Sequence, residues 1–342
     1  MPLDHTNFDN KARKQIYFAW VEYQRRPTSM SAYFGYDVCF VPTLLARPIF
    51  LKVLLSYPWQ AIRTAWTLVR QRPDAVWIQM PPNFVAHLCL LLCLVYGRNR
   101  PRLVADLHNS ALTRHWLSVP FTRRVLRKFD LVLVHNEDMR ALAVDLGLGA
   151  GNLHVLEDRS PSFGAIAATP PDGRPCFVVP CSFYKDEPVR NVLEAARLIP
   201  DYDFMITGPR ARAAGQGLLD NVPGNVTFTG FLPVDEYDAL VERATGILCL
   251  TTHDGVQLSA AGEAVGAGKP MIVSDKPLLL SLFTAGRFVD NSVEALRDAC
   301  RDVAGDYARY AAQTISLRDG AERNDRWLAQ ATPIRTLLTS EL

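Results

Sequence analysis

The stretch Gly246–Asp275 constrains the fold more than any other part of the chain. Gly246–Leu250 is a short apolar run with the length of a buried strand, and Pro270–Ser274 is a second one. Between them, Ser259 stands where a helix N-cap is expected and Gly268 where that helix would end. A strand, a helix and a second strand in this order predict a parallel βαβ unit and hence an α/β fold.

Polar and small residues in the same stretch predict a ligand site. Asp254 and Gly255 lie in the loop after the first strand, and small residues, Ala260–Gly262, begin the helix. A ligand can approach the backbone N–H groups of such a helix end, which attract anions. Glu263 lies about one turn inside, within reach of ligand hydroxyl groups. Alternatively, these glycines only allow close packing of helix and sheet.

Short apolar runs and helical patterns alternate along the rest of the chain, in two halves. A segment rich in proline, glycine and small residues, Phe163–Pro175, is typical of a linker between them. Because 342 residues exceed the usual size of one core, we expect two Rossmann-like, doubly wound α/β domains facing an interdomain cleft. The expected boundaries are 1–165 and 176–315, with a helical tail over 316–342 that packs back on the first domain. Strands are expected at Gln15–Val21, Asp37–Pro42, Ala75–Met80, Arg102–Leu107, Asp130–His135, Asn152–Leu156, Cys176–Pro180, Asp203–Thr207, Asn225–Phe228 and Arg287–Val289.

Two segments of the first half are assigned from their patterns. Glu22–Ser31 is rich in arginine, proline and serine and predicts a loop after the first strand. Pro48–Arg72 carries apolar residues at helical spacing and predicts a helix, with Trp59 and Trp66 expected in the core.

A polar cluster follows the strand expected to end at Leu107. Asp106, His108 and Asn109 come together there, at the carboxyl end of a strand, where α/β proteins carry their working residues. Either Asp106 and His108 act on a substrate, or Asp106 caps a turn and His108 packs beneath it.

The composition is that of an ordinary globular protein. A net charge of +2 gives no reason to expect a nucleic-acid partner. Seven cysteines without a CxxC pair do not fit a zinc site and favour a reduced, cytoplasmic compartment. The polar start of the chain does not resemble a signal peptide. Its longest apolar run, Leu88–Tyr96, is far shorter than the roughly 20 residues needed to span a bilayer.

Basic residues gather in one part of the first half. They could form a solvated helix face or a surface that meets anionic lipid headgroups. On the second interpretation the protein lies at the cytoplasmic face of a membrane. The residues concerned are Arg98, Arg100, Arg102, Arg123, Arg124, Arg127 and Lys128.

The motifs of the second half resemble nucleotide-sugar glycosyltransferases of the GT-B fold. Their order is VxxCSFYKDEPVRNVLEAA, DFMITGP, FLPVDEYDALVERATGILCL and DG…GEAVGAGKPMIVSD. In the first half, Gln79-Met80-Pro81-Pro82 and Asp106-Leu107-His108-Asn109 resemble turns of the chitobiosyldiphosphodolichol β-mannosyltransferases, to which the chain is most similar. It departs from the pattern around Ala261, where that family has a lysine. It also departs at Ser182 and Glu187, where the broader group often has arginine and lysine.

The resemblance implies a hexosyltransferase that moves a sugar, mannose in the most similar family, from a nucleoside diphosphate to an acceptor. The acceptor would be lipid-linked or a growing polysaccharide, bound by the first domain, and the donor would bind the second domain. A GDP-sugar is favoured over a UDP-sugar, and no metal or other cofactor is expected, because a helix end and cationic side chains can stabilise the leaving diphosphate. The donor-binding residues so implied are Ser182, Phe183, Lys185, Gly208, Phe231, Leu232, Asp254, Gly255, Ser259 and Glu263.

An inverting transfer needs a base that takes the proton of the acceptor hydroxyl, and His108 or Asp106 is the candidate. Two other functions fit the same architecture. A sugar-nucleotide epimerase would use the donor without an acceptor. A non-catalytic, membrane-associated scaffold of polysaccharide assembly would suit the missing cationic residues.

Overall fold

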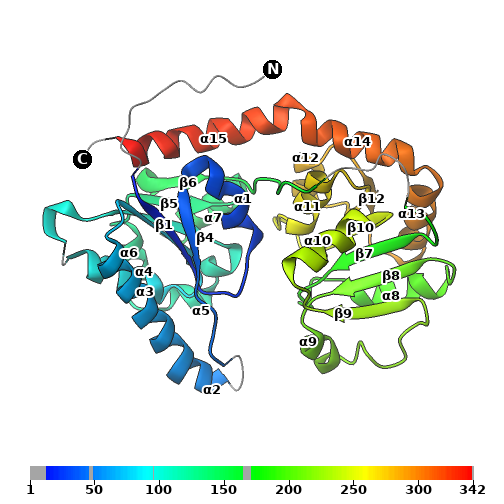
Figure 1. Ribbon diagram of the computed structural model, residues 1–342, viewed down its shortest axis with the longest axis horizontal. Helices are drawn as coiled ribbons and strands as arrows, with labels where there is room; N and C mark the ends of the chain where they lie inside the picture. Colours follow the sequence, from blue (N-terminus) through cyan, green and yellow to red (C-terminus); the bar gives the residue numbers. More distant parts are fainter. Residues whose placement is uncertain (1–12, 46–48, 95, 165–170, 341–342) are drawn as a thin grey trace. The chain divides into compact units, whose positions relative to one another are not determined.

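The computed structural model describes residues 13–45, 49–94, 96–164 and 171–340. The chain forms two compact units (Figure 1). The N-terminal unit extends to Glu157 and takes up the chain again from Trp327, and the C-terminal unit is Asp158–Arg326. The division falls within helix α15 (Ala321–Thr339). Residues 165–170 of the expected linker lie outside the described ranges.

Within its described residues, the N-terminal unit is built on a six-stranded parallel sheet of order β2-β1-β3-β4-β5-β6. Both faces of the sheet are covered, so its strands are mostly apolar, and β3 is buried at every residue. The elements are β1 (Gln15–Ala19), α1 (Arg25–Phe34), β2 (Tyr36–Phe40), α2 (Ile49–Leu51), the π-helix η1 (Lys52–Ser56), α3 (Tyr57–Gln71), β3 (Ala75–Met80), α4 (Phe84–Leu94), η2 (Gly97–Asn99), β4 (Arg102–Leu107), η3 (Asn109–Leu112), α5 (Arg114–Leu117), α6 (Thr122–Leu126), β5 (Leu131–Val134), α7 (Glu137–Asp145), η4 (Ala150–Asn152) and β6 (Leu153–Val155).

The C-terminal unit repeats this plan. Its described residues form a six-stranded parallel sheet of order β12-β11-β10-β7-β8-β9. The elements are β7 (Cys176–Pro180), α8 (Val189–Arg197), β8 (Asp203–Thr207), α9 (Arg210–Gly215), β9 (Val226–Gly230), α10 (Val234–Glu242), β10 (Gly246–Cys249), α11 (Ser259–Ala267), β11 (Met271–Ser274), α12 (Pro277–Leu282), β12 (Arg287–Val289), α13 (Val293–Gly305) and α14 (Tyr307–Asp319). The predicted α/β class is confirmed, and the predicted strands are present with ends shifted by at most two residues.

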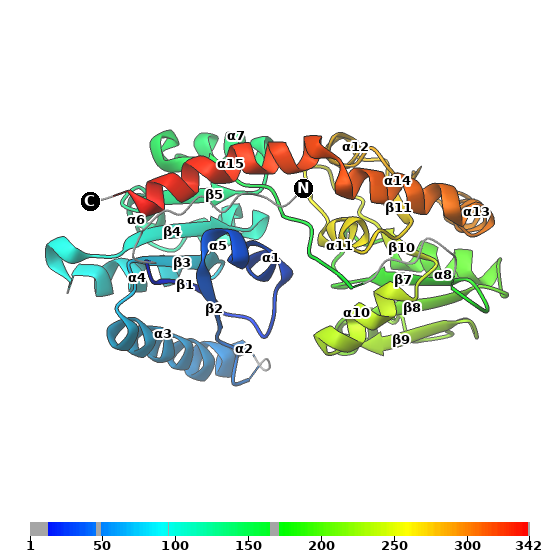
Figure 2. The same cartoon turned by 45° about the horizontal axis from the view of Figure 1, so that its top comes forward.

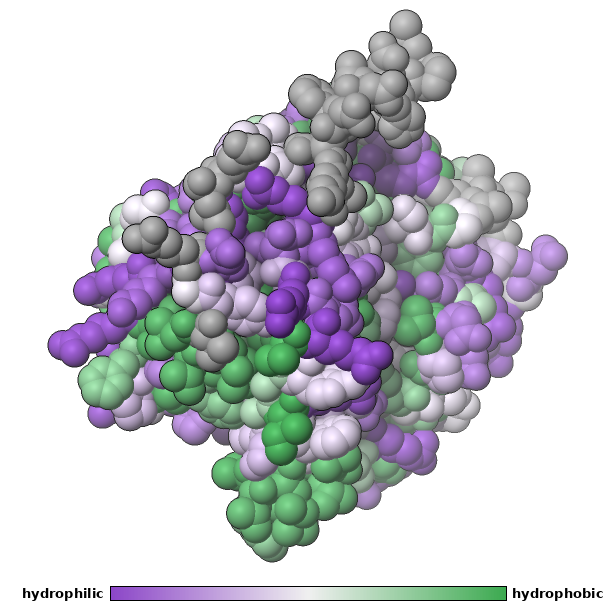
Figure 3. Space-filling model, turned by 60° about the vertical axis from the view of Figure 1, so that its left-hand side comes forward, coloured by the Kyte–Doolittle hydropathy of each residue, from purple (hydrophilic) through white to green (hydrophobic). Residues whose placement is uncertain are grey.

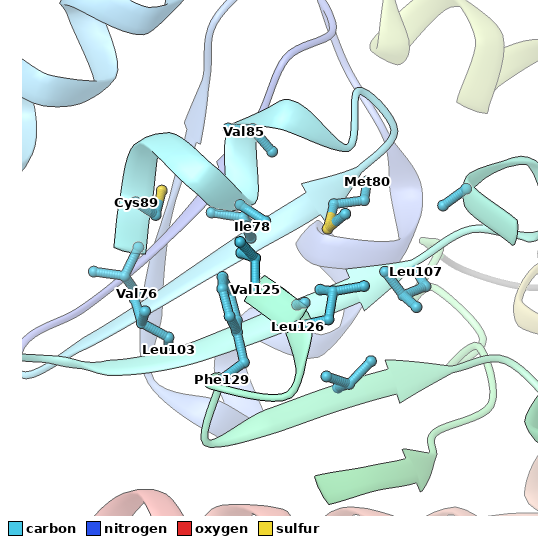
Figure 4. Close-up of a cluster of buried hydrophobic side chains, with 14 of the residues drawn as sticks. Val76, Ile78, Met80, Val85, Cys89, Leu103, Leu107, Val125, Leu126 and Phe129 are labelled. Atoms are coloured by element: carbon cyan, nitrogen blue, oxygen red, sulfur yellow. The ribbon is translucent and has the colours of Figure 1, made fainter. Parts of the chain in front are cut away.

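Two apolar layers enclose the N-terminal sheet. On one face, side chains of β3 and β4 such as Ile78 and Leu103 point toward α4 and α6 (Figure 4). On the other face, α1 and the end of α15 pack against the strands, so that α3 and α15 lie on opposite sides of the sheet (Figure 2). Trp327 anchors α15 there: its ring contacts Tyr33 edge-on at 4.9 Å, and its indole N–H donates to the Glu157 carbonyl at 3.1 Å.

Three local expectations are wrong. The segment expected to be a loop contains helix α1, with Pro27 in its first turn, where its missing N–H is tolerated. Trp59 and Trp66 are exposed, because α3 buries its polar side instead. Ser259 is the first residue of α11 and not its N-cap, which is Leu258.

Two glycines of α11 provide a stability test. A Cβ on Gly266 would lie 2.1 Å from the Pro161 carbonyl oxygen, whereas one on Gly262 meets no atom within 4 Å. We expect Gly266→Ala to lower the free energy of unfolding by about 1–3 kcal/mol through overpacking. Gly262→Ala should raise it by about 0.5–1 kcal/mol, because alanine restricts the unfolded chain. Urea denaturation of both variants is the measurement, and equal destabilisation by the two would contradict this packing.

Candidate active site

The topology of each sheet indicates one edge at which a ligand would bind. In parallel sheets, ligands bind beyond the carboxyl ends of the strands, where successive connections leave in opposite directions. That switch falls between β1 and β3 in the N-terminal unit and between β7 and β10 in the C-terminal unit. Gln24 follows β1 and His108 follows β4 in the first, and the loops after β7 and β10 form the second.

A buried ion pair lies under the N-terminal edge. Arg26 donates from Nε to Asp106 Oδ2 at 2.8 Å and from Nη2 to Oδ1 at 3.1 Å. Tyr17 donates its hydroxyl to the same carboxylate at 2.7 Å, and Arg26 also donates to the Leu156 carbonyl at 2.8 Å. Asp106 is fully buried. It therefore has no route to an acceptor hydroxyl, and this geometry argues against the expected role of Asp106 as the base.

The charges around Asp106 keep it ionised. Burial alone would raise the pKa of its carboxyl, but the charge and hydrogen bonds of Arg26, with smaller contributions from His135 and His108, hold that pKa well below its usual range. Burial is the main cause that raises the pKa of Tyr17, and the negative charge of Asp106 raises it further. His135 Nε2 lies 3.9 Å from Asp106 Oδ1. Asp106 is thus a permanent negative charge beneath two histidines.

His108 lies above this pair and is partly exposed. Its backbone N–H donates to the Met80 carbonyl at the end of β3, at 3.0 Å. Its ring meets the His135 ring edge-on at 4.7 Å between centroids, and its Nε2 lies 3.1 Å from Gln24 Nε2. Because an amide nitrogen only donates, His108 Nε2 is the acceptor when the Gln24 amide nitrogen faces it. The imidazole is held in a position from which it can accept a proton.

In the C-terminal unit, the loop after β7 folds around an acidic side chain. Glu187 accepts hydrogen bonds from the backbone N–H groups of Ser182 at 2.9 Å and Tyr184 at 2.8 Å. Burial raises the pKa of Glu187, and these hydrogen bonds oppose that effect. The expected ligand binding through Ser182 and Phe183 stays a prediction. Glu187 already accepts from the N–H groups of Ser182 and Tyr184, and the Phe183 ring is buried against Phe228 in the core.

The loops after β7 and β10 are joined by hydrogen bonds. The Thr251 hydroxyl donates to Asp186 Oδ2 at 3.0 Å, and the Thr252 N–H donates to the Asp186 carbonyl at 2.7 Å. Behind them, Ser274 bonds the Thr251 N–H at 2.9 Å and Asn291 Oδ1 at 2.7 Å. The edge at the switch point is thereby fixed in shape.

Gly208 follows β8 at the same edge and has φ 121°, with an added Cβ falling 1.8 Å from the Cys181 carbonyl oxygen. Only glycine allows this close approach of two backbones. The neighbouring helix α9 carries Arg212, which donates to the Ser182 carbonyl at 2.5 Å and lies over the Tyr184 ring at 4.7 Å. A cation therefore stands beside the loop after β7.

Helix α11 presents its first turn at this edge. Its N-cap residue, Leu258, makes no side-chain capping bond, and the space where a Gly262 side chain would be is open. Glu263 is mostly buried within that turn and accepts a 2.5 Å hydrogen bond from the Tyr237 hydroxyl of α10. A positive helix end and a carboxylate oriented by a tyrosine thus stand together.

The other predicted donor-site residues lie in loops at this edge. Lys185, Asp254 and Phe231 are exposed, and Leu232 is half-buried against the sheet. Gly255 has φ 69°, in the left-handed region that favours glycine. The donor-binding roles of these five residues stay predictions.

Comparison with known proteins agrees with this geometry. Residues 18–158 match the family model of the glycosyl transferase 4-like domain. A sucrose-phosphate synthase from Thermosynechococcus elongatus has a TM-score of 0.65 at 14% identity, over 95% of this chain and 98% of that one. Anabaena HepE in complex with UDP and glucose has a TM-score of 0.64 at 13% identity, over 96% and 100%. The galactosyltransferase WaaB of the lipopolysaccharide outer core has a TM-score of 0.54 at 13% identity, over 94% and 99%.

The chain has the GT-B fold. No curated protein sequence matches it. At these identities the solved structures establish the architecture alone, and the predicted GT-B fold is confirmed.

The basic residues predicted to face lipid differ in their surroundings within this GT-B chain. Arg100 is paired with Asp130 at 2.8 Å, which neutralises its charge, and Arg102 donates to the Ser340 carbonyl at 3.2 Å. Arg123 and Arg127 are exposed and bond carbonyls of the loop after α7. Arg124 lies over the Phe121 ring, Lys128 is exposed, and the side chain of Arg98 lies outside the described part of the structure.

Four site residues were not identified from the sequence. They are Arg26, Gln24, His135 and Tyr237. Arg26 falls in the segment whose composition predicts a loop, and its partner Asp106 lies 80 positions away. Tyr237 lies 26 positions from Glu263 on another helix, and no spacing rule connects them. In the part of the chain that the structure describes, no three His, Cys, Asp or Glu side chains gather as a metal ion would require.

The ion pair can be tested through stability. Arg26→Met leaves the Asp106 carboxylate buried without its cation, and we expect a loss of about 3–5 kcal/mol in the free energy of unfolding at neutral pH. Adding Asp106→Asn should recover part of the loss, because it removes the uncompensated charge. Chemical denaturation of the wild type and the two variants is the measurement.

The same variants should differ in their pH dependence. In the wild type the folded-state pKa of Asp106 is depressed, so its contribution is present above about pH 4 and is lost as the pH falls further. In Arg26→Met, burial raises that pKa, and stability should increase on acidification from neutral pH. Parallel pH profiles for the two proteins would refute the assignment.

Proposed function

We propose that this chain is a glycosyltransferase that moves a sugar from a nucleoside diphosphate to the hydroxyl group of an acceptor. The observation that carries the proposal is the first turn of α11, where the open space at Gly262 adjoins the buried Glu263 carboxylate and its Tyr237 partner. The match of the first half of the chain to a glycosyl transferase 4-like domain supports the same class of reaction.

The donor would bind at the carboxyl edge of the C-terminal sheet. Its diphosphate would accept hydrogen bonds from the start of α11, where the helix dipole favours an anion. Arg212 and Lys185 would contribute positive charge, in place of the cations that the broader group carries in the loop after β7. Glu263 would bind ribose hydroxyls, since a carboxylate has room for donors besides Tyr237.

The acceptor would bind the N-terminal unit, with His108 as the base. Asp106 would position and polarise the two histidines and not touch the acceptor. His108 Nε2 is bonded to Gln24, and an acceptor hydroxyl would replace that amide and then transfer its proton to the ring. The leaving diphosphate would depart from the sugar anomeric carbon as the acceptor oxygen bonds to it with inversion.

The finer assignments rest on the sequence resemblance. We propose mannose as the sugar, GDP as its carrier and a lipid-linked or polysaccharide acceptor. UDP is the rival carrier, because HepE has been solved in complex with UDP and glucose. The transfer is proposed to need no metal ion.

Donor binding is tested by thermal shift. GDP or UDP should raise the melting temperature in the presence of EDTA, because a ligand that binds only the native state stabilises it. Glu263→Gln should weaken the preferred nucleotide by about 1.5–3 kcal/mol, the range for a hydrogen bond to a charged group. Glu294→Gln, an exposed acid in the first turn of α13, is the matched control. An unchanged melting temperature with both nucleoside diphosphates would contradict the proposed donor site.

The base is tested by turnover. His108→Ala should reduce kcat by about 10²–10⁴-fold with little change in donor affinity, and the acidic limb of the pH–rate profile should disappear. A rise in KM without this pH effect would instead make His108 a sugar-binding residue. Glu22→Gln tests the next carboxylate at this edge, which is exposed.

The same assay separates the rival functions. Turnover of the sugar nucleotide that proceeds without any added acceptor would indicate epimerisation. Donor binding without turnover, in the presence of lipid-linked and polysaccharide acceptors, would indicate a scaffold.

A further inference from the structure

The segment from α2 through η1 to α3 is amphipathic, but its polar side faces the protein and its apolar side faces outward. Its buried side chains are Ser56, Gln60, Thr64 and Thr67 together with one leucine, and Tyr57 and Ala61 are partly buried against the core. Its exposed side is apolar, with Leu54 66%, Ile62 64% and Trp66 59% exposed. Helices that cover a core in water bury their apolar side. The further exposed apolar residues of the segment are Phe50, Val53, Leu55, Trp59 and Val69.

Hydrogen bonds hold the segment in this orientation. Gln60 donates to the Val41 carbonyl at 2.7 Å, and Thr64 accepts from the Trp20 indole at 3.0 Å. The Ser56 hydroxyl bonds both the N–H and the carbonyl of Leu45. Turning the apolar side inward would break these bonds and leave buried polar groups unsatisfied, which is unfavourable. The apolar side is therefore fixed outward.

A second group of exposed apolar residues lies on α4 and just before α6, two helices that share a hydrophobic core with α3. Leu91 and Leu94 are exposed on α4, and Phe121 is exposed before α6. The two helices pack together, and His87 of α4 bonds the Pro120 carbonyl at 2.7 Å. Figure 3 shows a broad hydrophobic area on this side of the molecule, and a hydrophobic projection at the end where Figure 1 places α2.

Basic residues far outnumber acidic ones in this part of the sequence. Residues 38–129 contain thirteen arginines and lysines but only two acidic residues, Asp74 and Asp106. Asp106 is fully buried and paired with Arg26. On the apolar segment itself, Lys52 lies over the Tyr57 ring and Arg70 over the Trp66 ring, at 5.7 and 5.1 Å. Basic side chains beside exposed aromatic rings suit the boundary between anionic headgroups and acyl chains.

We propose that the apolar face of residues 50–69 inserts into the interface of an anionic lipid bilayer, with the surrounding basic residues on the headgroups. This assigns membrane contact to α2, η1 and α3 and makes the arginines of α6 accessory. The helices would lie parallel to the membrane surface, because no helix of the described residues is long and apolar enough to cross a bilayer. The inference does not depend on the proposed reaction, because lipid binding is measured without donor or acceptor.

The test is flotation of the full chain with vesicles. Vesicles of phosphatidylglycerol and phosphatidylcholine in roughly equal parts should carry the wild type, and phosphatidylcholine alone should carry much less. The double variant Ile62→Gln/Trp66→Gln should lose at least about tenfold in partitioning. Its melting temperature should be unchanged, because both side chains are exposed. Leu198→Gln, at an exposed leucine of the C-terminal unit, should bind as the wild type does.

Penetration is tested separately from electrostatic attraction. Phosphatidylcholine with brominated acyl chains, mixed into the anionic vesicles, should quench the tryptophan fluorescence of the wild type. Trp59→Phe/Trp66→Phe should remove that quenching while flotation persists. Arg63→Gln and Arg70→Gln should each weaken binding about fivefold, an effect that added salt should abolish.

Two results would overturn the proposal. One is flotation of Ile62→Gln/Trp66→Gln equal to that of the wild type. The other is a wild type that binds neither kind of vesicle but forms a dimer, detected by light scattering, that the double variant does not form. The second result would assign the apolar face to a second copy of the chain.

Discussion

The N-terminal unit depends on one buried ion pair. Arg26 comes from α1 and Asp106 from β4, and their hydrogen bonds reach Tyr17 on β1 and the Leu156 carbonyl after β6. Two charges without solvent are tolerated only when both are paired and hydrogen-bonded. This pair meets that condition and ties four elements together directly beneath His108. Its place under a candidate base suggests that the ion pair also orients and polarises the site.

The sequence predicts the sheets well for a physical reason. A parallel strand covered on both faces is mostly apolar, so β3, β4, β7, β8 and β12 have the bounds that their apolar runs predict. Helix starts are less certain, because a helix can begin without a capping side chain. Both α1 and α11 do so, and the arginines and the proline of α1 predict a loop instead of a helix.

The site could be predicted only in part. The polar turn at His108 and the first turn of α11 follow from their positions after buried strands, which sequence reveals. The pairings do not follow, since Arg26 and Asp106 or Tyr237 and Glu263 come from distant segments. Glu187 shows the same limit. Its position in the sequence predicts a loop that lacks a phosphate-binding cation. In the fold, Glu187 accepts hydrogen bonds from two backbone N–H groups that a ligand could otherwise use.

Helix α3 shows what periodicity leaves open. The spacing of Trp59, Ile62 and Trp66 specifies an amphipathic helix and the face on which its apolar side chains lie. It does not specify what that face meets. Burying it in the core was the expected choice, but Gln60 and Thr64 have hydrogen-bond partners only on the inner side, at Val41 and Trp20. An apolar helix face that the fold turns outward, in a region with few carboxylates, is better matched by lipid than by water. Attachment there would also bring the unit proposed to bind the acceptor to the surface that would carry the proposed lipid-linked acceptor.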